Sequence, residues 1–143
     1  MKTTGALTNE IRTLLKEQLG DSVWPREYPL FPGDRTSFKA DIFIKGDPQI
    51  FVEVDEQQAN PDTNVSKYWM YLEKNPDLKI TLIHVFGEIV TGQNYKSRAD
   101  LAAFIANKIE GATNGSFKYH PIRKELQSGN IVRQILKIKQ INK

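Results

Sequence analysis

The stretch Ile50-Phe51-Val52-Glu53-Val54-Asp55-Glu56-Gln57 opens with the alternating pattern of a β-strand. Successive side chains of a strand point to opposite faces of a sheet, so the three aliphatic residues share one face. Glu53 and Asp55 then share the other face with Phe51. This one strand is therefore predicted to carry both a core-facing stripe and a pair of carboxylates.

A second strand-like run, Lys39-Ala40-Asp41-Ile42-Phe43-Ile44, comes shortly before it, and residues 45–49 between them are typical of a tight turn. In the second run, Ala40 is expected to share a face with Ile42 and Ile44. In an antiparallel hairpin centred on Asp47, three pairs of residues would lie opposite each other. They are Phe43 with Phe51, Asp41 with Glu53, and Lys39 with Asp55.

The predicted pairing of Asp41 with Glu53 needs a physical reason. Directly opposed side chains on a sheet face are only about 5 Å apart, and like charges there are destabilising. One reason would be a divalent metal, which takes carboxylate and carbonyl oxygens as ligands. The alternative is an exposed face whose register differs by two residues, so that the charges avoid each other.

The composition sets limits on the class of protein. A chain of 143 residues with 39% hydrophobic residues suits one globular domain, here taken as residues 1–143. There is no apolar run of about 18 residues to span a membrane, and the first residues lack the apolar core of an export signal, so we expect a cytoplasmic protein. The chain has no cysteine. A net charge of +3 and a pI near 9.1 mildly favour a polyanionic partner.

Apolar spacing elsewhere predicts the remaining elements. Helices are expected at about 6–19, 62–74 and from Ser97 to about 110, with an irregular edge strand in 22–30, a strand buried on both faces at 79–86, and a short strand at 117–122. Residues 131–138 could form a basic helix or a strand, and the helix is favoured. The third helix should bury Leu101, Phe104, Ile105 and Ile109. The order α-β-β-β-α-β-α-β predicts an α/β fold, a mixed sheet flanked by helices. His84 and His120 have no partner at metal-binding spacing and are interpreted as structural.

This order, together with the acids, resembles the restriction-endonuclease-like nucleases of the PD-(D/E)xK superfamily. The likeness covers a core of about residues 5–123, with a basic extension at 124–143. It implies that Asp41 is the first acid of the active site, Glu53 the second, and Asp55 the residue in the third position. It also implies a metal ligand at Glu10 on the first helix.

The chain departs from that family at two positions. Ala40 stands where the family has proline, and Asp55 stands where it usually has lysine. Lys39 and Lys67 are the two candidates to replace that lysine. The alternative for Lys39 is a cross-strand ion pair with Asp55, and for Lys67 a solvated helix position.

The resemblance implies a metal-dependent DNA endonuclease, with Mg²⁺ or Mn²⁺ held by the two acids and the Val54 carbonyl. Asp55 and one lysine would orient the attacking water. Gln57 and Gln58 could contact DNA, support the ligands of the metal or be polar loop residues. The basic candidates for phosphate contacts, with a solvated face as the alternative, are Lys118, Arg123, Lys124, Arg133 and Lys137. The short chain shows no separate target-recognition domain, which favours a homodimer or recognition of DNA structure. The alternative is a non-catalytic nucleic-acid-binding or interaction module on the same fold.

Overall fold

A computed structural model describes residues 5–33, 38–55, 62–86, 93–123 and 127–141, with the backbone alone for 93–98. Its elements follow in chain order: α1 (Ala6–Leu19), η1 (Gly20–Ser22), β1 (Tyr28–Pro29), β2 (Lys39–Ala40), β3 (Ile42–Ile44), β4 (Gln49–Asp55), α2 (Thr63–Lys74), β5 (Ile80–Phe86), α3 (Gln93–Ala112), β6 (Phe117–Ile122) and α4 (Ser128–Ile141).

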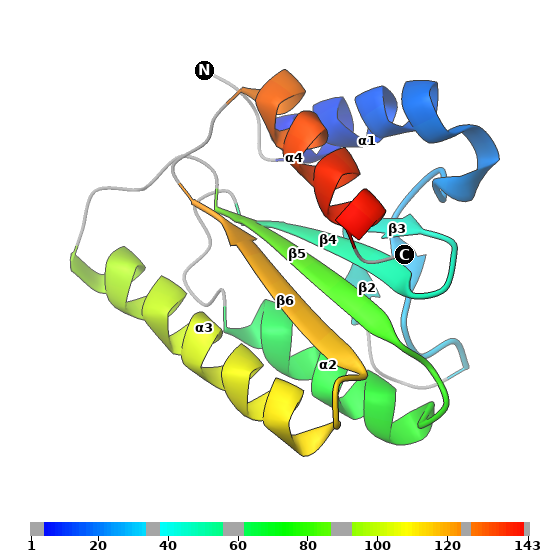
Figure 1. The fold of residues 1–143 in the computed structure, drawn as a ribbon. Coiled ribbons are helices and arrows are strands. Elements are labelled where there is room, and N and C mark those ends of the chain that lie inside the picture. Colours follow the sequence, from blue (N-terminus) through cyan, green and yellow to red (C-terminus); the bar gives the residue numbers. More distant parts are fainter. Residues whose placement is uncertain (1–4, 34–37, 56–61, 87–92, 124–126, 142–143) are drawn as a thin grey trace.

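A four-stranded sheet in the order β3-β4-β5-β6 forms the centre of the fold. Strands β3 and β4 pair antiparallel, whereas β4, β5 and β6 run parallel. Helices α1 and α4 cover one face of the sheet, and α2 and α3 cover the other (Figure 1). The predicted α/β class, with a mixed sheet flanked by helices, is therefore confirmed at this level.

The hairpin has the predicted register where it is regular. Phe43 pairs with Phe51, and their stacked rings have centroids 4.9 Å apart. The alternation fails just beyond the regular ladder, because the chain bends at Asp41 between β2 and β3. Ala40 consequently packs with Phe43 and Phe51 on the α2–α3 face, so the expected grouping of Ala40 with Ile42 is wrong.

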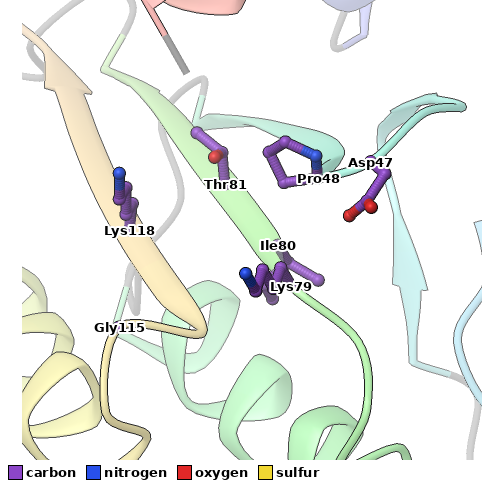
Figure 2. A pocket seen from close by; sticks show the side chains of 7 residues that line it. All are labelled: Asp47, Pro48, Lys79, Ile80, Thr81, Gly115 and Lys118. Carbon is purple, nitrogen blue, oxygen red and sulfur yellow. The ribbon is translucent and has the colours of Figure 1, made fainter. Parts of the chain in front are cut away.

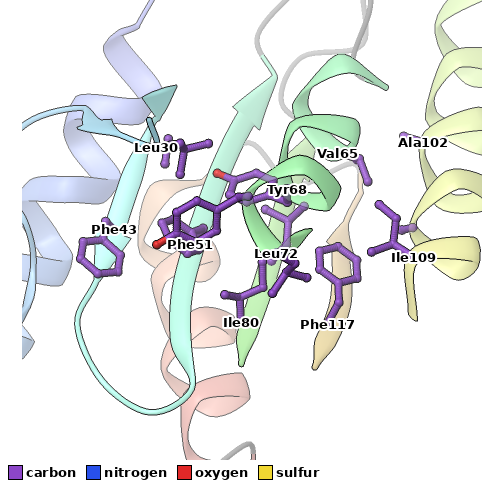
Figure 3. Close-up of a cluster of buried hydrophobic side chains, with 14 of the residues drawn as sticks. Leu30, Phe43, Phe51, Val65, Tyr68, Leu72, Ile80, Ala102, Ile109 and Phe117 are labelled. Atoms are coloured by element: carbon purple, nitrogen blue, oxygen red, sulfur yellow. The ribbon is translucent and has the colours of Figure 1, made fainter. Parts of the chain in front are cut away.

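The crossover from β4 through α2 to β5 follows the prediction closely. All seven residues of β5 are buried, as expected for a parallel strand covered on both faces. Figure 3 shows part of the core between this sheet and its α2–α3 layer, where Phe51, Tyr68 and Leu72 lie together. Here the sequence pattern and the packing agree because the strand is apolar on both sides.

Helix α3 differs from the prediction in its start and in its buried face. It begins at Gln93, so the loop expected up to residue 96 is largely helical. Leu101 and Phe104 are 39% and 58% exposed, and the expectation that they are buried is wrong. The buried face is formed by Ala99, Ala102, Ala106 and Ile109. Small alanine side chains let the helix approach α2 and the sheet closely, which the larger residues would prevent.

The ends of the chain complete the other face of the sheet. The strand expected within residues 22–30 is reduced to two residues, Tyr28–Pro29, and a single bridge between Val23 and Ile44. Helix α4 buries Ile131, Val132 and Ile135 in the cluster that α1 also lines. Among the helices that the structure describes, none is long and apolar enough to cross a membrane.

Candidate functional site

Asp41 and Glu53 meet at the point where the hairpin ladder stops. The backbone N–H of Asp41 donates to Glu53 Oε2 at 3.3 Å, and Asp41 Oδ2 accepts from the N–H of Val54 at 2.8 Å. The Asp41 side chain thus bonds a backbone donor of the neighbouring strand. The guanidinium of Arg12, from α1, also donates to the Asp41 carbonyl, which holds the bend in place. The two predicted acids are therefore brought together.

Lys67, on helix α2, contacts Glu53 beside Asp41. Its Nζ donates to Glu53 Oε1 at 3.0 Å, to the Lys39 carbonyl at 2.6 Å and to Asn64 Oδ1 at 3.2 Å. The residue is only 8% exposed, so the alternative of a solvated position is wrong for Lys67. The Tyr68 hydroxyl, one position further along, donates to Glu53 Oε2.

Burial dominates the electrostatics of the acids. Glu53 is 1% exposed, and this desolvation raises its pKa to about 8. The Asp41 carboxylate also raises the pKa of Glu53, whereas the Lys67 ammonium lowers it. Burial also raises the pKa of Asp41, against the lowering effects of the Val54 hydrogen bond and of Lys67. One ammonium group therefore does not compensate for the burial of these two carboxylates.

Asp55 lies two residues further along the same face of β4, in a second set of contacts. Asn64 donates to Asp55 Oδ1 at 2.6 Å, and His84 Nε2 contacts Asp55 Oδ2. The other ring nitrogen of His84 lies 2.8 Å from the Tyr119 hydroxyl. Asp55 and His84 are both 0% exposed, so the contact between their side chains is fully buried.

The other two candidates from the sequence are placed differently. Strand β2 pairs with β1, so Lys39 does not oppose Asp55 in a ladder, and its side chain is exposed. Glu10 is half-buried on α1, which packs on the sheet face opposite to Glu53. Within the described ranges, no three acidic or histidine side chains form a group that could hold a metal. Glu10 is therefore not brought to Asp41 and Glu53 as a third carboxylate.

The remaining donors still fit a hard divalent cation. Two carboxylates and nearby backbone carbonyls are the oxygen ligands that Mg²⁺ and Mn²⁺ prefer. Burial raises the pKa values of Asp41 and Glu53, and the one ammonium of Lys67 leaves their ionised forms short of positive charge. A divalent ion beside them would supply that charge, and the donor chemistry is compatible with it.

The predicted DNA contacts are spread over the molecule. Lys118 pairs with Thr81 near the start of the parallel strands, whereas Asp55 pairs with Phe86 at their far end. Lys118 is therefore not brought to the acids.

Three other basic residues among the predicted DNA contacts lie within the described residues. Arg123 follows β6 at the same end of the strands as Asp55, but its guanidinium contacts Asp100 Oδ1 at 3.1 Å and the Ala99 carbonyl. Arg133 and Lys137 are exposed on α4. Gln57, Gln58 and Lys124 lie outside the described residues.

A cavity of about 340 Å³ lies beside Lys118, away from the acids (Figure 2). It is lined by the hairpin turn and by the first residues of β5 and β6, namely Asp47, Pro48, Lys79, Ile80, Thr81, Gly115 and Lys118. Its position at the start of the parallel strands separates it from Glu53 and Asp55. This hollow is therefore distinct from the candidate site.

Sequence reasoning named Lys67 but missed the other polar partners of the acids. Asn64, Lys67 and Tyr68 occur at positions i, i+3 and i+4 of one helix, so they lie on one face of it, and this spacing was a usable signal. His84 and Tyr119 gave no such signal, because only the sheet register brings them to Asp55.

No protein-family model and no curated protein matches this sequence.

Proposed function

We propose that this protein is a Mg²⁺- or Mn²⁺-dependent DNA endonuclease. The observation that supports this most is the contact between Lys67 Nζ and Glu53 Oε1 at 3.0 Å, directly beside Asp41. It restores, from a helix, the combination of two acids and one lysine that the sequence lacks on its strand. This combination suits hydrolysis of a phosphodiester, in which charge must be stabilised and water activated.

Each residue of the site would have a distinct role. Asp41, Glu53 and the Val54 carbonyl would hold the ion, which when bound supplies Lewis-acid stabilisation of charge on the scissile phosphate and activates water. Lys67, whose three N–H donors are already used within the site, would stabilise charge on the phosphate through its positive charge. Tyr68 keeps Glu53 oriented through its hydroxyl.

The first experiment tests the acids with substitutions that keep the shape of the side chain and remove its charge. Asp41→Asn and Glu53→Gln should each lower metal-dependent cleavage at least about 100-fold, because a ligand charge is lost while the side-chain shape remains. DNA binding should stay equal or become tighter, since negative charge facing the phosphates is removed. Cleavage is measured on duplex, nicked, single-stranded and branched DNA, with each metal and with EDTA.

Two lysine variants separate the candidates for the missing lysine. Lys67→Met should abolish cleavage, whereas Lys39→Met should retain it, because only the backbone carbonyl of Lys39 takes part in the site. Calorimetric titration with Mn²⁺ gives a readout besides activity, and Asp41→Asn should weaken that binding.

The outcomes distinguish the endonuclease from its alternative. If the wild-type protein binds DNA but cuts none of the substrates with either metal, the endonuclease proposal fails and a nucleic-acid-binding module remains. If Asp41→Asn cuts as well as the wild type, the assignment of the site is wrong.

A further inference from the structure

Asp55 stands in the third position of the acidic strand, and its contacts connect it to two other elements of the fold. It is 0% exposed, and each of its carboxylate oxygens already has a partner. Asn64 Nδ2 donates to Oδ1 at 2.6 Å, and His84 Nε2 contacts Oδ2. Asp55 is thus connected to α2 through Asn64 and to β5 through His84.

The neighbour that connects Asp55 to the candidate site is Asn64. Asp55 Oδ1 accepts its hydrogen bond from the NH₂ end of the Asn64 amide. The carbonyl end of the same amide is then turned to the ammonium of Lys67, 3.2 Å away. Lys67 in turn donates to Glu53 Oε1. The orientation of one amide group thus links the two sets of contacts.

Two further residues hold Asp55 from the other side. His84 lies on β5 and is fully buried, with one ring nitrogen on Asp55 and the other 2.8 Å from the Tyr119 hydroxyl of β6. The backbone N–H of Tyr119 donates to Glu110 Oε1 at 2.9 Å, which ties β6 to α3. The chain of contacts therefore runs from the sheet interior to Glu53.

We propose that Asp55 is a positioning residue that acts through Asn64 to hold the Lys67 ammonium against Glu53. His84 and Tyr119 keep the Asp55 carboxylate in the orientation that this requires. The inference rests on the proposed function for its catalytic consequence, because Lys67 is the catalytic cation there. The proposal explains why Asp55 can occupy the position where the motif that this strand resembles carries lysine. The lysine comes from α2, and Asp55 orients the Asn64 amide that contacts it.

The decisive measurement is a double-mutant cycle in stability, which needs no cleavage. Asp55→Asn and Lys67→Met are made singly and together, and unfolding constants are measured in urea with EDTA. Asp55 and Lys67 are connected through Asn64, so we expect their effects to be coupled, by about fivefold or more in the unfolding constant. The cycle is then repeated with Asn64→Ala in every variant.

The Asn64→Ala background separates the relay from simple attraction between charges. Direct attraction between Asp55 and Lys67 does not need Asn64 and would persist, whereas coupling through the amide should fall to at most about twofold. A coupling that is equal with and without Asn64 would overturn the proposal. Asn75→Ala is the matched control, since this amide lies at the end of the same helix and donates to the Tyr71 carbonyl instead.

Cleavage kinetics provide a second test with a different signature. Asp55→Asn and Asn64→Ala should lower kcat about 10- to 100-fold, as for other residues that orient a catalytic group. The KM for DNA should stay within about twofold, because neither residue is placed to touch DNA. Tyr119→Phe should lower kcat less, and Tyr71→Phe, which removes a hydroxyl contact to Gln49, should leave it unchanged.

These results distinguish failure of the inference from failure of the proposed function. If the wild type cleaves DNA and Asn64→Ala keeps the full kcat, the relay is overturned and the endonuclease stands. If the wild type cleaves nothing, the endonuclease falls, and the stability cycles still decide whether Asp55 positions Lys67.

Discussion

Glu53 is the residue whose chemistry depends most on its surroundings. It is enclosed by Lys67, Tyr68 and the backbone of Asp41, and burial raises its pKa from an ordinary 4.5 to about 8. Without a metal, the folded protein therefore holds a proton on this carboxyl group at pH values where the unfolded chain has released it. Asp41, whose pKa is also raised, acts in the same direction.

We expect the metal-free protein to lose stability as the pH rises between about 4.5 and 8. In this window the folded state binds more protons than the unfolded chain, so the free energy of unfolding falls by at most about 1.4 kcal/mol per pH unit for one group. Urea unfolding in EDTA across this range measures the slope. Glu53→Gln cannot titrate and should have a flatter profile, and equal slopes in both proteins would contradict the raised pKa.

At the level of residues, the sequence predicted that Asp41 and Glu53 lie together, and it included Lys67 among two possible lysines. It could do so because alternation along a strand determines which side chains share a face. The partners of Asp55 were not predictable, since His84 and Tyr119 come from strands that lie 29 and 64 residues further along the chain. Only the parallel register of β4, β5 and β6 brings them together.

At the level of elements, α3 shows where an apolar pattern misleads. Its large residues Leu101 and Phe104 are exposed, and its alanines form the contact with α2 and the sheet. A periodic apolar pattern identifies a helix, but it does not give the distance between the helix and its neighbours. Here that distance is short, so small side chains are buried and large ones are not.

Substitutions in α3 should reflect this inversion. Ala106→Leu is expected to destabilise the protein by about 1–3 kcal/mol, because added methylene groups have no space in a closely packed contact. Phe104→Ala should change stability by less than about 0.5 kcal/mol, since its ring is largely solvent-exposed. Urea denaturation compares the two variants, and a larger loss for Phe104→Ala would show that the packing of α3 is assigned incorrectly.

At the level of the whole molecule, the α/β class with a mixed sheet flanked by helices was predictable, but the distribution of positive charge was not. Short-range patterns locate elements, whereas the end of the sheet at which a residue lies depends on strand direction and register. Lys118 and Glu53 consequently lie towards opposite ends of the parallel strands. The packing of α4 on α1 is a further long-range feature that no local pattern indicated.

This arrangement makes a prediction about DNA binding. We expect the affinity for DNA to fall with salt concentration, and we expect Lys118→Ala to leave the log–log slope unchanged, because Lys118 is remote from a phosphate held at the acids. Fluorescence anisotropy without divalent metal measures both slopes. A reduction by about 0.9 in the variant would mean that one phosphate contact is lost, and that DNA also passes the start of the parallel strands.

The origin of Lys67 in α2, and not in the strand that carries Glu53, has a consequence for local unfolding. A lysine on β4 would be as persistent as the sheet itself, whereas Asn64 and Lys67 lie in the first two turns of a helix, where fraying begins. Any opening that releases these turns withdraws the ammonium and leaves the central strands intact. We therefore expect the contact between Lys67 and Glu53 to open together with α2 and not with the sheet.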